Sequence, residues 1–141
     1  MSITIKETKC IVDMKIVHTK HFPFGSYTTI NIFGVLFTKQ DRLIPSTINH
    51  EKIHTEQMKE MGYIFFYLWY LIEYLLIRLF HKKQGNAYHD VSFEEEAYNN
   101  QYNYSYLKSR KHYAWIIVSN NMFRNTIFRI YLITSCYIVL T

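Results

Sequence analysis

A chain of 141 residues and 17.1 kDa has the usual size of one domain, so we expect residues 1–141 to form a single domain. Hydrophobic residues make up 49% of the sequence and aromatic residues 18%, which excludes a disordered chain. The net charge of +5 is too small to indicate a nucleic-acid-binding protein, and we expect no nucleic-acid partner.

The first 40 residues are rich in strand-forming side chains. β-Branched and aromatic residues concentrate in residues 3–6, 14–18 and 27–38, which predicts two to four strands. Gly34 interrupts the last of these stretches and marks either a bulge or a close approach of the backbone to a neighbouring element. We therefore expect a small N-terminal antiparallel sheet in a domain of the α+β class.

A long helical region is predicted next. Ser46, Thr47 and Asn49 are candidate N-cap residues, and residues 50–80 contain no proline and a single glycine, Gly62. This pattern predicts one long helix that bends at Gly62, or two helices in sequence.

A capping box predicts a further helix. Ser92 is followed three residues later by Glu95, so the helix should begin at Ser92 and run towards Arg110. Residues 46–118 would then form the helical part of the domain, and residues 119–141 an apolar C-terminal tail.

Residues 63–80 form a largely apolar stretch of eighteen residues, the length at which a membrane-spanning helix becomes a candidate. Glu73 lies near its middle, and five of the eighteen residues are Tyr or Trp, which prefer the membrane interface. We expect a core helix in which Glu73 is a hydrogen-bonded carboxylate. Membrane association through residues 63–80 is the alternative.

The sequence from His50 to His54 is an HExxH motif. On a helix, the spacing of four residues places both imidazoles on one face, where they can bind one zinc ion. Glu51 then lies beside the metal and can act as general base towards a water molecule that attacks a carbonyl carbon.

A third metal ligand is expected from the acidic run at residues 94–96, since zinc hydrolases commonly use two histidines and a glutamate. If Ser92 is the N-cap, Glu95 is its capping-box partner, and either Glu94 or Glu96 faces the metal. These two residues are about 200° apart around a helix, so only one of them can be a direct ligand.

These motifs resemble those of the gluzincin metallopeptidases, in which a glutamate on a later helix completes the HExxH site. Residues 94–97 match the ExxA part of the gluzincin pattern, which aligns Glu94 with the metal ligand. Tyr98 stands where gluzincins usually carry an aspartate that supports a ligating histidine, so another acceptor is required, with Asp90 and Asn49 as candidates. Residues 49–98 also resemble small bacterial HExxH proteins with NHExxH, FYLWYxxEY and SFExEAY segments.

The resemblance implies a zinc-dependent peptidase with a peptide or protein substrate. An edge strand within residues 27–38 would bind the extended substrate by main-chain hydrogen bonds. Candidates for supporting the metal ligands or stabilising the transition state lie close to Glu94 in sequence, and they are His89, Tyr88, Glu96, Tyr98 and Tyr102.

Other interpretations remain open. The two histidines can be ordinary helix residues without metal, and the acidic run can serve only to interact with the helix dipole. The chain is then a non-catalytic protein that binds a membrane or a partner, with a structural or vestigial metal site. A binder of acidic partners would use a set of basic residues, namely Lys108, Arg110, Lys111, Arg124 and Arg129.

The two cysteines, Cys10 and Cys136, are far apart in sequence and exclude a disulfide framework. The first residues lack the continuous apolar stretch of a secretory signal. Both observations favour a cytoplasmic protein, with membrane association through residues 63–80 as the alternative.

Overall fold

The computed structural model describes residues 14–80 and 87–118. A small sheet is followed by five helices in this part of the chain, which confirms the α+β class. The strand expected at residues 3–6, the tail at residues 119–141 and both cysteines lie outside the described residues.

The sheet contains β1 (Lys15–His18), β2 (Thr29–Ile32) and β3 (Val35–Thr38) in the order β1-β3-β2. β2 and β3 are antiparallel, but β1 pairs with β3 in parallel, so the expectation of a wholly antiparallel sheet is wrong. The ten-residue connection between β1 and β2 is long enough for β3 to insert between them. β2 is consequently an edge strand.

A tight turn at Phe33 and Gly34 joins β2 to β3, so residues 29–38 form a hairpin. Both turn residues have positive φ, 51° for Phe33 and 80° for Gly34, as a type I′ hairpin turn requires. A Cβ atom added to Gly34 would lie 3.2 Å from Cγ2 of Thr55 on the first helix. The predicted close approach of the backbone at Gly34 to a neighbouring element is therefore confirmed. Gly34 lies in a hairpin turn and not in a bulge.

Helix α1 (Pro45–Met61) and helix α2 (Tyr63–Phe80) meet at Gly62 with a bend of 107°, as predicted for this glycine. The N-cap of α1 is Ile44, and Pro45 occupies the first helical turn, where its missing N–H is not needed. The prediction that Ser46, Thr47 or Asn49 is the N-cap is wrong, because the helix starts at Pro45 and all three residues lie inside it.

Helix α3 (Ser92–Asn100) is followed by two short helices, α4 (Tyr106–Ser109) and α5 (Ala114–Val118). The predicted capping box is wrong, because Val91 is the N-cap and Glu73 of α2 accepts hydrogen bonds from both the backbone N and Oγ of Ser92. Glu73 is fully buried, which confirms it as a hydrogen-bonded core carboxylate.

The end of α3 also differs from the prediction, since the helix stops well before Arg110. The side-chain amide of Asn49 donates to three backbone carbonyls in this region, those of Asn100, Gln101 and Asn103. These contacts satisfy carbonyl groups at the helix end and turn the chain away from the helix axis.

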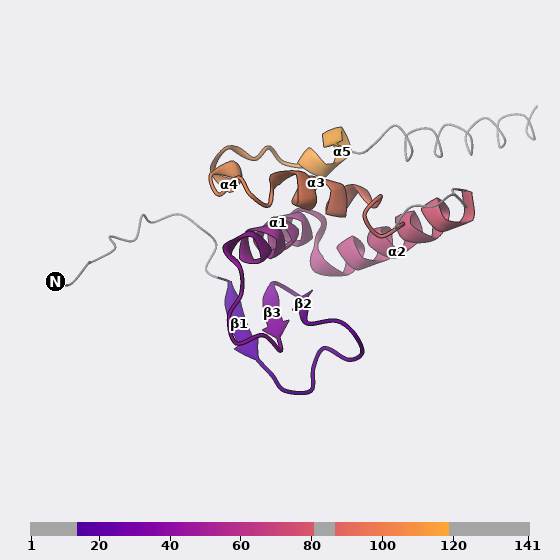
Figure 1. Ribbon diagram of the computed structural model, residues 1–141. Coiled ribbons are helices and arrows are strands. Elements are labelled where there is room, and N and C mark those ends of the chain that lie inside the picture. Colours follow the sequence, from indigo (N-terminus) through magenta and orange to yellow (C-terminus); the bar gives the residue numbers. More distant parts are fainter. Residues whose placement is uncertain (1–13, 81–86, 119–141) are drawn as a thin grey trace, which may run out of the picture.

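The helices enclose a core formed by a cluster of apolar side chains, Met58, Phe66, Ile77, Val91, Phe93 and Trp115. Figure 1 shows α1 between the sheet on one side and the α3–α5 segment on the other, with α2 extending away from the bend. Within the described residues, no single helix has the length and apolar character needed to cross a membrane, whereas α1 and α2 taken together as a bent pair do.

Candidate metal centre

Helix α1 brings the two histidines of the HExxH motif together. Both side chains are buried, and their Nε2 atoms lie 3.0 Å apart. The imidazole rings meet edge to face, with centroids separated by 4.6 Å. The predicted placement of His50 and His54 on one helix face is therefore confirmed.

Glu94 of α3 completes the cluster. Its Oε2 lies 3.3 Å from Nε2 of His50, and its Oε1 lies 3.4 Å from Nε2 of His54. One ligand atom from each of the three residues lies within 4.8 Å of the other two, so this buried group could hold a metal ion. Helices from different parts of the sequence thus assemble the His-His-Glu set that the motifs predicted.

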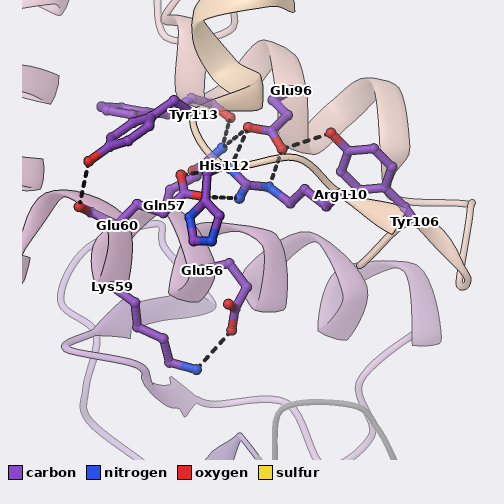
Figure 2. A network of polar contacts seen from close by, with 10 residues as sticks. Glu56, Gln57, Lys59, Glu60, Glu96, Tyr106, Arg110, His112 and Tyr113 are labelled. Atoms are coloured by element: carbon purple, nitrogen blue, oxygen red, sulfur yellow. Dashed lines mark hydrogen bonds and ion pairs between the residues drawn. The ribbon is translucent and has the colours of Figure 1, made fainter. Parts of the chain in front are cut away.

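Glu96, the other candidate for third ligand, points elsewhere. Its carboxylate binds the guanidinium of Arg110, which also binds Glu60 of α1 (Figure 2). Tyr106 donates a further hydrogen bond of 2.9 Å to Oε1 of Glu96. Glu96 is therefore saturated by other partners. Arg110, expected as a surface cation, is a buried one with a side chain only 5% exposed.

The charges of the cluster stabilise one another. Burial alone would lower the pKa of His54, but attraction to the Glu94 carboxylate outweighs it and raises the pKa to about 9. Burial acts to raise the pKa of Glu94, yet His54 and His50 together lower it well below its usual range. Without a bound ion, the cluster is consequently a protonated histidine paired with a carboxylate at neutral pH.

Gln57 orients His54. Its Oε1 lies 2.7 Å from Nδ1 of His54, while its Nε2 donates to the backbone O of Phe93 and to Oε2 of Glu96. Because Nε2 is held by two acceptors, Oε1 must face the imidazole and accept a hydrogen bond from Nδ1–H. A neutral His54 then carries its lone pair on Nε2, the atom that faces Glu94.

Gln57 was missed by the sequence reasoning, although it follows His54 by three residues on the same helix and its position predicts the same face. Neither Asn49 nor Asp90 is the acceptor, since Asn49 binds backbone carbonyls and Nδ1 of His50 is buried without a hydrogen-bond partner in the described structure.

Two tyrosines hold the Glu94 carboxylate. Tyr70 of α2 donates to Oε1 over 3.2 Å, and Tyr88 hydrogen-bonds Glu94 as well. Burial and the nearby Glu94 charge raise the pKa of both hydroxyls, which keeps them protonated as donors. Tyr70 was also missed, because a tyrosine within an aromatic helix carries no distinctive signal in the sequence.

The outer side of His50 is covered by the other aromatic candidates. The ring of Tyr98 packs against His50 with centroids 4.6 Å apart, and His89 packs on Tyr98 at 4.2 Å. His89 is exposed and Tyr98 is half-buried, so these two residues line the solvent side of the cluster. Tyr102 is 73% exposed, and no contact in the described structure joins it to the three ligands.

Glu51 lies next to the cluster on α1. Burial raises the pKa of Glu51 above its usual value, although His54 and His50 act in the opposite direction. Asn31 of the edge strand β2 donates to the backbone O of Glu51 and to Oγ1 of Thr55, and it accepts a hydrogen bond from the backbone N of Gly34. Asn31, a further residue missed in the sequence, thereby attaches the hairpin to the HExxH helix.

Comparison of the chain with protein-family models, with curated protein sequences and with solved structures found no match in any of the three. The case for a metal centre therefore rests on the geometry of His50, His54 and Glu94.

Proposed function

We propose that the chain is a zinc-dependent metallopeptidase in which His50, His54 and Glu94 bind the ion and Glu51 is the general base. The spacing of the three ligand atoms carries this proposal. Tetrahedral zinc with bonds of about 2.0–2.1 Å requires its ligand atoms to lie about 3.3–3.4 Å apart. Here the two Nε2 atoms lie 3.0 Å apart, and each faces a different oxygen of Glu94, at 3.3 Å for His50 and 3.4 Å for His54. One ligand atom from each of the three residues lies within 4.8 Å of the other two, so a small movement of the side chains would bring all three to the spacing of one ion.

The bonding state of the ligands supports the same assignment. Oε2 of Glu94 is buried without a hydrogen-bond partner in the described structure, although a buried carboxylate oxygen normally has one. Two imidazole nitrogens that face each other at 3.0 Å can both bind one cation, whereas without it one must carry a proton. A cation between these atoms would satisfy all three residues.

The residues around the ion have the chemistry that peptide hydrolysis requires. Bound zinc polarises a carbonyl group and lowers the pKa of water towards neutrality. Glu51 accepts a proton from the attacking water and passes it to the amide nitrogen, so the water oxygen bonds the carbonyl carbon while the C–N bond breaks. The raised pKa of Glu51 favours this acceptance. Tyr98 packs on His50 and His89 packs on Tyr98, and either residue would be the donor of a hydrogen bond to the carbonyl oxygen in this proposal.

The sheet provides a place for an extended substrate. β2 is an edge strand, and Asn31 attaches it directly to the backbone at Glu51. A peptide that adds to this edge by main-chain hydrogen bonds would run beside α1 near the three ligands.

Elemental analysis of the purified, tag-free protein tests the metal site. We expect one zinc per chain in the wild type and in Glu51→Gln, and none in His50→Ala or Glu94→Ala. Absence of zinc from the wild type after reconstitution would contradict the proposal.

A protease assay with a mixed peptide library tests the reaction. Glu51→Gln should abolish cleavage while the ion remains bound, and Glu56→Gln, a half-exposed glutamate on the same helix, is the matched control that should retain cleavage. A wild-type protein that binds zinc but cleaves no peptide would instead favour a structural metal site.

A further inference from the structure

Helix α2 has two apolar faces on opposite sides. Phe66, Glu73 and Ile77 are buried against the rest of the protein. On the other side, an outer stripe of large apolar side chains is 47–68% exposed, and it comprises Ile64, Phe65, Leu68, Leu71, Ile72 and Leu75, with Leu79 continuing it. At about 100° per residue these positions share an arc of about 120°, and at about 1.5 Å per residue the stripe is about 22 Å long.

An apolar surface of this kind requires an explanation. Single exposed apolar side chains are common, but a contiguous stripe along a whole helix face marks a surface that binds something. Helix α5, which contacts α2 through one pair of tryptophans, carries further exposed apolar side chains. Trp115 contacts Trp69 of α2 with centroids 6.3 Å apart, and the adjacent Ile116 and Ile117 are exposed.

The charges around the outer stripe indicate the chemistry of its partner. The stripe itself contains no charged residue, and the only acidic residue of α2, Glu73, is buried and hydrogen-bonded to Ser92. Arg78 is exposed at one edge of the stripe and donates to the Tyr74 hydroxyl over 2.9 Å.

Apolar side chains with a basic, tyrosine-bearing edge match the interface of a bilayer, where acyl chains meet anionic headgroups. We propose that the outer stripe of α2 docks onto the surface of a membrane that contains anionic lipids. The stripe enters the boundary between headgroups and acyl chains, and Arg78 contacts the phosphates. A second copy of the chain would meet the same acid-free stripe and would provide no counter-charge for Arg78.

The docking surface and the metal centre lie on different sides of α2. Tyr70 and Phe66, which contact the Glu94 and His54 side chains, come from the inner side of the helix. Membrane docking therefore leaves the three metal ligands in place, and the proposal does not depend on the peptidase function.

Sedimentation with lipid vesicles tests the proposal on the full chain. We expect binding to vesicles of phosphatidylcholine mixed with phosphatidylserine, and weaker binding to phosphatidylcholine alone or at high salt. The double variant Leu68→Ser/Ile72→Ser should bind at least about tenfold more weakly, because two apolar side chains no longer enter the bilayer. The matched control is Phe24→Ser/Ile44→Ser, which removes two exposed apolar side chains outside α2 and should bind like the wild type.

The charge contribution has its own variant. Arg78→Gln should reduce the preference for phosphatidylserine and leave binding to phosphatidylcholine unchanged. Equal binding by the stripe variant and the wild type would overturn the proposal. Two other results would also overturn it, because each would show that protein covers the stripe. The first is a wild-type protein that binds no vesicles and forms a dimer, while the stripe variant is a monomer. The second is a loss of thermal stability in the stripe variant.

Discussion

Glu94 and Glu96 lie on the same short helix and are both almost fully buried, yet their carboxylates meet different partners. Both oxygens of Glu96 accept hydrogen bonds: Oε1 from Arg110 and Tyr106, and Oε2 from Arg110 and Gln57. Glu94 faces two histidines, and its Oε2 has no hydrogen-bond partner in the described structure. Burial of a carboxylate therefore does not identify a metal ligand. What distinguishes Glu94 as the candidate ligand is an oxygen that its partners leave without a hydrogen bond.

The largest difference is expected between the alanine variants of the two glutamates, because Glu94 is the proposed metal ligand and Glu96 is the partner of Arg110. Glu94→Ala removes a ligand, so we expect loss of the bound ion, measured by elemental analysis. Glu96→Ala leaves His50, His54 and Glu94 in place, but Arg110 loses one of its two carboxylate partners and keeps only Glu60. Its folded fraction should retain metal, and a metal-free but stable Glu96→Ala protein would contradict the comparison.

Removal of Arg110 tests whether its ion pairs with Glu96 and Glu60 stabilise the fold. Arg110→Gln leaves two buried carboxylates, Glu60 and Glu96, without their cation, and such a change typically costs about 3–5 kcal/mol of unfolding free energy. Chemical denaturation measures the loss. Lys108→Gln on α4 is the matched control, since Lys108 is exposed and should change stability by less than about 0.5 kcal/mol.

Gln57 connects the two sites, because its amide reaches both His54 and Glu96. Gln57→Leu should weaken metal binding about 10- to 100-fold, since His54 loses the acceptor that fixes its ring. Titration with cobalt, followed by its visible absorption, measures the affinity. Gln101→Leu is a suitable control, because its side chain has no described role at the cluster, and an unchanged affinity in Gln57→Leu would exclude a positioning role.

The pH dependence of metal binding tests the protonation of His54. Below its pKa of about 9, His54 in the metal-free protein carries a proton that the ion must displace. Apparent metal affinity should therefore rise about tenfold per pH unit from neutrality and level off above pH 9. The pKa of Glu94 is lowered, so this residue stays ionised throughout. A flat profile in calorimetric titrations would show that His54 is neutral before the metal binds.

The parts of the fold that local sequence signals predicted are those with short-range causes. Gly62 placed the bend between α1 and α2, and the spacing of the HExxH motif placed both histidines on one face. The predicted caps of α1 and α3 were wrong, because Pro45 starts one helix and Glu73 reaches Ser92 from another. A cap supplied by a residue nineteen positions away leaves no local pattern.

By itself, the sequence determined the α+β class, the pair of histidines on one helix face and the two glutamates that are candidates for a third ligand. Each of these follows from patterns and spacing within single elements. Only the tertiary structure distinguishes Glu94 from Glu96 as the candidate ligand, because Arg110 pairs with Glu96 while Glu94 of α3 faces the histidines of α1. It also revealed Gln57, Tyr70 and Asn31 around the cluster. Their roles depend on contacts between helices and strands that are distant in sequence, and hydrogen bonds of that kind form only when the chain is packed.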